Sequence, residues 1–198
     1  ANLPEWFSEV KFIGGSGLLS PGQVGETTLN LNPGKYIIEC YVKMSNGIFH
    51  TSMGMTKDIV VSEKNSENKA LEADIKVSIS STDGIVFNDS INKGKHTFSV
   101  YYKDQIVHEN FVGHDVNLVK LDNNVDLKVL ENWMNWADPK GLIEPAPSGF
   151  TFLGGVNDMP EGYIGYFTVM LEPGNYALIS EVPNTTSKNM LKTFVITD

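Results

Sequence analysis

The chain has 198 residues and is 41% hydrophobic, which allows one large globular domain or two small ones. Its net charge is −9, and an acidic surface is a poor nucleic-acid binder because neutralised phosphate supplies most of that affinity. No apolar run approaches the about 20 residues of a membrane-spanning helix, so no membrane span is predicted. The single cysteine excludes an internal disulfide.

The first 62 residues predict turns and short strands. Glycines and prolines are frequent between Gly14 and Gly25 and predict a loop-rich region. Alternating apolar residues predict strands over Tyr36–Val42 and Lys57–Ser62. Residues 63–74 are polar, charged and free of aromatic residues, which predicts a linker.

From Ile75 onward the pattern changes to longer alternating strands. Strands are predicted over Ile75–Ile79, His96–Tyr101 and Asp115–Leu121. Asp126–Trp136 has apolar residues at helical spacing and predicts one short helix. Residues 75–198 therefore form a strand-rich unit with a single helix.

The chain also contains an internal repeat. A shift of 140 positions superimposes the following pairs: Gly14 on Gly154, Gly22 on Gly162, Gly25 on Gly165, Pro33 on Pro173, Gly34 on Gly174, Tyr36 on Tyr176 and Val42 on Val182. Beyond Val182 the second copy is five residues shorter, and Met55 then corresponds to Met190. Two copies of one strand-turn-strand-loop-strand unit are therefore predicted.

The two copies differ in what precedes them. Residues 75–198 include strands and a helix before the second copy and are predicted to form a complete domain. Residues 1–62 correspond only to the C-terminal half of such a domain. Half a sandwich leaves sheet edges and an apolar face open. We therefore expect either a longer natural chain or completion against the second domain or a partner chain.

The first copy holds a group of soft metal ligands. Cys40 ends a predicted strand, and His50 and Met55 follow on the next loop. A thiolate, an imidazole and a thioether together are the donor set that copper prefers. The alternative is a buried structural cysteine with an ordinary loop histidine and methionine.

These residues resemble the cupredoxins, the Greek-key β-sandwiches of the blue-copper proteins. The resemblance lies in the Pro33-Gly34-Lys35-Tyr36 turn, the strand ending at Cys40, and the His50-to-Met55 spacing. The long loop between Cys40 and His50 is similar to that in the first domain of copper nitrite reductases. The resemblance implies an exported protein, periplasmic or secreted, with copper held by Cys40, His50 and Met55.

The second copy resembles the family less completely. Gly113–Val119 is similar to the segment that carries the first copper histidine, which would make His114 a further candidate ligand. Ser180 stands where the first copy has Cys40, and the shortened loop Pro183–Lys188 contains no histidine. The resemblance therefore implies no type 1 copper site in the second copy. In the first copy, the corresponding first histidine would lie in the missing half.

Bond-making catalysis is not indicated. Glu39 precedes Cys40 at the position where nitrite reductases place a histidine for their second copper, so nitrite reduction is not expected. No clustered carboxylates or paired nucleophile and histidine are evident, and no catalytic residue is predicted.

The sequence thus predicts an all-β, cupredoxin-like Greek-key sandwich with a partial N-terminal copy, residues 1–62, and a complete domain, residues 75–198. The leading functional hypothesis is a mononuclear copper site in the first copy, used with a redox partner for electron transfer or for copper handling. The alternative is a metal-free binding or scaffold module with degenerate copper ligands.

Overall fold

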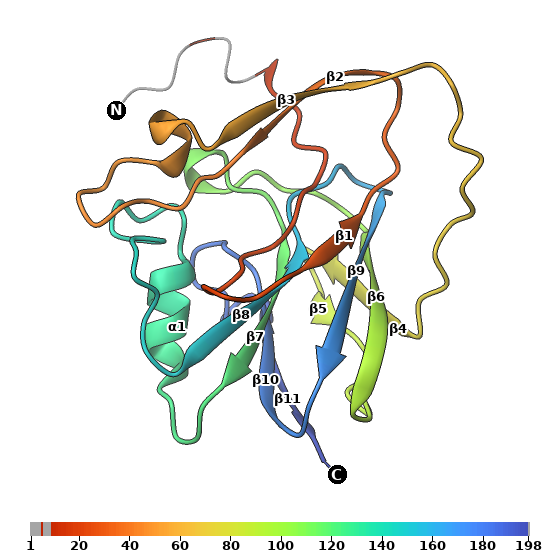
Figure 1. Ribbon diagram of the computed structural model, residues 1–198. Helices are drawn as coiled ribbons and strands as arrows, with labels where there is room; N and C mark the ends of the chain where they lie inside the picture. Colours follow the sequence, from red (N-terminus) through yellow and green to blue (C-terminus); the bar gives the residue numbers. More distant parts are fainter. Residues whose placement is uncertain (1–4, 6–8, 198) are drawn as a thin grey trace.

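The computed structural model describes residue 5 and residues 9–197 and consists mainly of β-strands (Figure 1). The first residues of the predicted 1–62 unit therefore lie outside the described part. In chain order the elements are β1 (Glu26–Thr28), β2 (Gly34–Glu39), the 3-10 turn η2 (His50–Met53), β3 (Thr56–Val61), β4 (Ile75–Ser80), β5 (Gly84–Val86), β6 (Gly94–Tyr102), the 3-10 turn η3 (Glu109–Phe111), β7 (Val116–Leu121), α1 (Leu127–Met134), β8 (Phe150–Val156), β9 (Ile164–Leu171), β10 (Gly174–Ile179) and β11 (Leu191–Ile196).

Two sheets form the main body. One has five strands in the order β1-β9-β6-β4-β5, and the other has four in the order β11-β10-β7-β8. Strands β4 and β6 run parallel, whereas the other neighbours in these two sheets run antiparallel. Some neighbours are consecutive in the chain, such as β4 and β5 or β10 and β11, whereas β1 and β9 come from distant parts of it.

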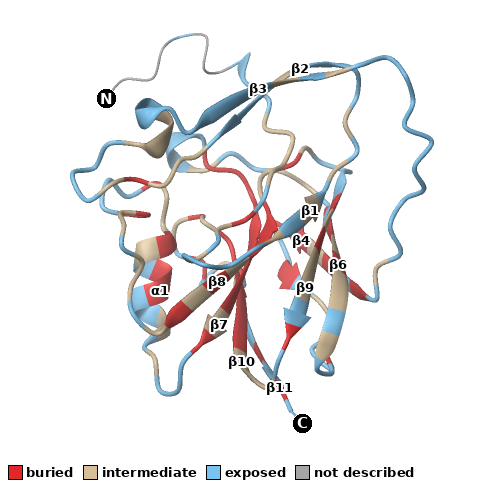
Figure 2. Cartoon of the chain, in the orientation of Figure 1, coloured by how far each residue is buried: buried red, intermediate tan, exposed pale blue. Residues whose placement is uncertain are grey.

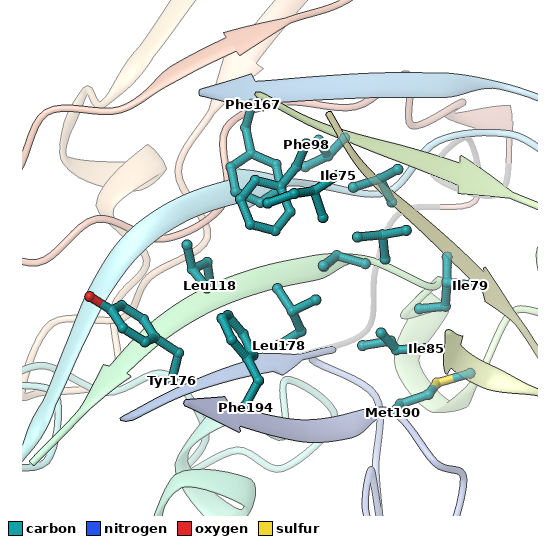
Figure 3. Packing of buried hydrophobic residues seen from close by; sticks show 14 of the residues in the cluster. Ile75, Ile79, Ile85, Phe98, Leu118, Phe167, Tyr176, Leu178, Met190 and Phe194 are labelled. Atoms are coloured by element: carbon teal, nitrogen blue, oxygen red, sulfur yellow. The ribbon is translucent and has the colours of Figure 1, made fainter. Parts of the chain in front are cut away.

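The main core lies between these two sheets (Figures 2 and 3). On β4 the alternating Ile75, Val77 and Ile79 are buried, as their two-residue period predicts. Phe98 and Phe167 stack with ring centroids 4.6 Å apart, and Leu118 and Leu178 lie in the same core from the opposite sheet. The predicted all-β sandwich is confirmed.

The short helix α1 covers the outer face of the four-stranded sheet. Asp126 caps its first turn, because its side chain accepts a hydrogen bond from the Lys128 amide. Leu130 and Met134 are fully buried in a second core with residues of β7, β8 and β10. The predicted helix is confirmed, although it begins and ends slightly inside Asp126–Trp136.

Residues 16–28 extend both sheets of the sandwich. Ser16 and Leu19 form bridges to Val156 and Leu153 on β8, and β1 pairs antiparallel with β9 (Figure 1). Gly17 permits this approach, since a Cβ atom there would lie 2.8 Å from the backbone nitrogen of Gly155. Part of residues 1–62 therefore lies at sheet edges formed by strands β8 and β9.

Strands β2 and β3 form a separate two-stranded sheet, here called the β2–β3 ribbon. It lies at the top of the molecule in Figure 1, and its strands are largely exposed (Figure 2). Residues 62–74, all of them described, contain no helix or strand. The division into a partial and a complete domain stays a prediction. Among the described residues, no helix is long and apolar enough to cross a membrane.

Candidate metal centre

Cys40 directly follows β2, and Thr51 fixes its backbone. The Cys40 amide donates to Thr51 Oγ1 at 3.0 Å, while the Thr51 hydroxyl and amide donate to the Cys40 carbonyl at 2.7 and 3.1 Å. Thr51 belongs to η2, which begins at His50. These bonds close the loop so that the first two predicted ligands come together. The thiol is free and partly exposed.

The Cys40 Sγ and His50 Nδ1 atoms are 3.7 Å apart. A metal about 2.3 Å from sulfur and about 2.0 Å from nitrogen, at a near-tetrahedral angle, holds these two atoms roughly 3.5 Å apart. The observed separation therefore suits a shared metal, and it equally suits a weak hydrogen bond from the thiol to the ring.

Glu144 contacts the other nitrogen of the same ring. Its Oε2 atom lies 3.2 Å from His50 Nε2, and the two side chains are 44% and 24% exposed. A proton on Nε2 donated to this carboxylate leaves the Nδ1 lone pair directed toward Cys40. Histidines that bind metals commonly donate their second ring nitrogen to such an acceptor. Glu144 thus selects the tautomer in which His50 can act as a ligand.

Lys43 anchors the loop between Cys40 and His50 on residues 138–141. The side chain is buried, and its Nζ donates to the carbonyls of Asp138, Pro139 and Gly141 at 3.1, 3.4 and 2.8 Å. Burial lowers the pKa of Lys43 below its ordinary value. We call Lys43 and its three carbonyl acceptors the Lys43 dock. The dock also positions Glu144, because the Glu144 amide donates to the Lys43 carbonyl at 2.8 Å.

Aromatic side chains surround the same dock. The Tyr41 ring meets Phe12, Phe49 and Trp136 edge-on, and Phe49 stacks on Trp136 with centroids 6.1 Å apart. Lys43 Nζ lies 5.6 Å above the Phe49 ring and 5.9 Å above the Trp136 ring. Such contacts stabilise a buried cation and exclude water from its hydrogen bonds. The loop that carries the candidate ligands is therefore held without a metal.

Met55, the third predicted ligand of the first copy, follows η2. Its amide donates to the His50 carbonyl at 3.1 Å, but its side chain is 58% exposed. The corresponding Met190 is completely buried. The structure therefore holds the Met55 backbone against the His50 backbone while leaving the thioether largely in solvent.

His114 lies in a different environment. It is completely buried, with Nδ1 3.5 Å from Asp104 Oδ1 and its ring centroid 5.3 Å from that of His108. Burial and the neighbouring His108 lower its pKa. Within the described residues, neither ring nitrogen has a hydrogen-bond partner. The contacts of His114 are thus with residues of its own domain.

Ser180, the counterpart of Cys40, faces a buried carboxyl. The Ser180 hydroxyl donates to Asp115 Oδ1 at 2.6 Å, and the Asp115 amide lies 3.3 Å from Ser180 Oγ. Burial raises the pKa of Asp115 to about 7, even though Ser180, Glu181 and Asn117 all donate hydrogen bonds to its carboxylate. The second copy thus has a hydrogen-bonded acid where the first has a thiol and an imidazole.

The described residues contain no group of three or more histidine, cysteine, aspartate and glutamate side chains placed to hold a metal. Cys40 and His50 are therefore two candidate ligands that lie close together, and not a complete ligand set. Sequence reasoning missed Glu144, which lies outside every motif and meets the first copy only through the fold. It also missed Lys43, which lies within the first copy but is not a residue type that indicates a metal site.

Comparison with known proteins finds similarity among solved structures. A reduced auracyanin from Roseiflexus castenholzii has 16% identity and a TM-score of 0.43, covering 62% of this chain and 95% of that one. Auracyanin B has 20% identity and a TM-score of 0.41, covering 67% and 96%. Rusticyanin from Thiobacillus ferrooxidans has 14% identity and a TM-score of 0.35, covering 62% and 75%.

These solved proteins are cupredoxins, the family that the motifs resemble. At this level of similarity, what they bind says nothing about what the present chain binds. No protein-family model and no curated protein matches the chain.

Proposed function

We propose that the chain is a cupredoxin-like module that binds copper through Cys40 and His50, for copper handling or one-electron transfer. The observation that carries the proposal is the 3.7 Å separation of Sγ and Nδ1, with the opposite ring nitrogen held by Glu144. Thiolate and imidazole are ligands that suit copper, and Glu144 orients the ring without contacting the metal.

Each residue has a defined part in this proposal. Cys40 supplies the thiolate, His50 supplies Nδ1, and Thr51 holds the backbone on which both depend. Met55, which lies between η2 and β3, would be a candidate weak axial ligand. His114, which contacts Asp104 and His108, is left out of this ligand set. When bound, copper would supply a one-electron redox couple.

The proposal is tested by titrating the protein with Cu(I) against a chromophoric chelator and measuring sulfur coordination by X-ray absorption. We expect one copper per chain with a single thiolate, and loss of that copper in Cys40→Ser. His50→Asn distinguishes a two-ligand site from a lone reactive thiol. If His50 is a ligand, this variant should bind copper more weakly although Cys40 is still present.

Methionine variants provide matched controls. Met53 and Met55 are both exposed on the same loop, at 65% and 58%. If Met55 acts as an axial ligand, Met55→Leu weakens copper binding and Met53→Leu does not. Equal copper binding by wild type and Cys40→Ser would overturn the proposed site.

One observation favours a second candidate, a metal-free binding module. The loop from Cys40 to His50 is already fixed by the Lys43 hydrogen bonds and the aromatic contacts. A scaffold of this kind presents ordered loops to a partner without a metal. Absence of stoichiometric copper, with unchanged hydrogen exchange in the loop when copper is added, would favour this function.

Export to the periplasm or outside the cell, and the use of a redox partner, are further parts of the copper proposal. Both follow from the cupredoxin resemblance of the Pro33–Met55 motif and stay predictions. Fractionation of the natural host, with antibody detection of this chain, measures the location directly.

A further inference from the structure

The β2–β3 ribbon has an open edge. Within the described residues, β2 pairs with β3 on one side, and no strand pairs with its other side. Ile37 and Ile38, which point to opposite faces of the strand, are 63% and 57% exposed. A strand edge of this kind is a template for another strand, and an isolated two-stranded sheet is only marginally stable.

The same molecule contains a second hairpin built in the same register. Gly34 pairs with Val61 in the β2–β3 ribbon, and Gly174 pairs with Ile196 in the β10–β11 hairpin. The tyrosine two residues after each glycine makes the same bond: Tyr36 donates to the Asn32 carbonyl and Tyr176 to the Glu172 carbonyl, both at 2.7 Å. The two hairpins therefore share pairing and turn geometry.

In the β10–β11 hairpin the corresponding edge is occupied. Strand β7 pairs antiparallel with β10, from Asn175 opposite Leu121 to Ile179 opposite Asn117. Ala177 and Leu178, the counterparts of Ile37 and Ile38, are completely buried on the two faces of this sheet, Ala177 beneath α1 and Leu178 against the five-stranded sheet. Among the described residues, no strand takes the place of β7 beside β2, and Ile37 and Ile38 are exposed.

We propose that the open edge of β2 binds an antiparallel β-strand of a partner polypeptide, with apolar side chains on both faces as in β7. Both faces of the incoming strand must be apolar because Ile37 and Ile38 are exposed on both faces of β2. Main-chain hydrogen bonds to β2 supply affinity, and the two apolar rows select the strand. The docking does not depend on copper.

The β7 register also predicts what the strand brings toward Cys40. At Ser180, the counterpart of Cys40, the neighbouring group is Asp115, which immediately precedes β7 and lies 2.6 Å away. A strand docked on β2 in this register therefore places the residues just before its own start beside the Cys40 thiol. This second consequence rests on the proposed copper site, since those residues could complete it.

The probe is a synthetic peptide with the sequence of Gly113–Leu121, added at millimolar concentration to the full chain and followed by NMR hydrogen exchange. We expect several-fold slower exchange at the amides of Lys35–Glu39 that face the open edge. A peptide N-methylated at alternate residues keeps its side chains but cannot pair, so it should give no protection. Protection elsewhere, or none at all, would overturn the proposal.

Two variants and a copper measurement complete the test. Ile38→Asp should abolish protection, whereas Val24→Asp, at a site that is 94% exposed, should not. If protection at Lys35–Glu39 rises with protein concentration in the absence of peptide, the edge binds a second copy of the chain. That result would overturn the proposal of a partner strand. A peptide with alanine in place of its histidine should bind to β2 equally well. If both peptides bind but neither changes the Cu(I) affinity of the chain, the strand does not complete the copper site, and the proposed strand binding still holds.

Discussion

The β2–β3 ribbon and the β10–β11 hairpin are built to one plan and differ in their surroundings. Both have the same register and the same tyrosine hydrogen bond, yet Leu178 is completely buried and Ile38 is 57% exposed. The hairpin carries Ser180 against a buried acid, whereas the ribbon carries Cys40 against an imidazole. The comparison teaches that pairing and turn geometry come from the local sequence, while burial comes from the layers packed on each face of the sheet.

The largest difference between the ribbon and the hairpin should appear in the free energy of unfolding when equivalent apolar side chains are truncated to alanine. Leu178→Ala removes a fully buried side chain and should lower the free energy of unfolding by about 2–5 kcal/mol. Ile38→Ala, at the equivalent position of the ribbon, should change it by less than about 0.5 kcal/mol because the side chain is exposed. Urea unfolding followed by circular dichroism measures both; equal losses would mean that Ile38 is covered in solution.

The buried acid beside Ser180 should make stability fall with rising pH. Burial raises the pKa of Asp115 from 3.8 to about 7, so between these values the folded protein holds a proton that the unfolded chain has released. The free energy of unfolding therefore decreases as pH rises through this window, by up to a few kcal/mol. Asp158 and Glu181, whose pKa values are also raised by burial, act in the same direction.

Asp115→Asn separates this acid from the others. Its unfolding free energy should depend less steeply on pH between about 4 and 7 than that of the wild type. The exposed Asp89 provides the control, since Asp89→Asn should leave the slope unchanged. Equal slopes in Asp115→Asn and the wild type would show that Asp115 is ionised in the folded protein.

The loop dock should be weakened locally by Lys43→Met. Methionine fills similar space but leaves three backbone carbonyls without their donor, a loss of about 1–3 kcal/mol. Hydrogen exchange should accelerate at the amides of Lys43 and Glu144, which bond across the dock. Lys35→Met, on the exposed strand β2, should leave these amides unchanged; a similar acceleration in both variants would argue against the anchoring role.

Much of the architecture follows from local sequence patterns. The alternation of Ile75, Val77 and Ile79 identifies a strand with one core face, and Asp126 with Leu130 and Met134 identifies the helix and its buried side. These features depend on residues close together in the chain. Their physical causes, the strand period and helix capping, are visible in a single sequence.

The site was only partly predictable, because some of its residues are far apart in the chain. Cys40 and His50 are separated by ten positions, and their spacing indicated that one loop brings them together. Glu144 lies 94 positions from His50, in a stretch between two prolines, and only the Lys43 dock brings it to the ring. The 58% exposure of Met55 likewise depends on the surrounding fold, which local spacing does not encode.

The smallest effect on the fold, and the most specific effect on the site, should come from Glu144. Its side chain is 44% exposed, so Glu144→Ala should change the free energy of unfolding by less than about 0.5 kcal/mol. Copper affinity should nevertheless fall by about 10–100-fold, because His50 Nε2 loses the acceptor that fixes its tautomer and orientation. Competition against a Cu(I) chelator measures the affinity.

Glu144→Gln decides whether the carboxylate acts by orienting the ring. The amide oxygen of glutamine can still accept from Nε2, so this variant should recover most of the affinity that alanine loses. Glu161→Ala, at an exposed acid on another loop, should match the wild type and controls for net charge. If alanine and glutamine at position 144 both bind copper as tightly as the wild type, Glu144 is a surface contact only.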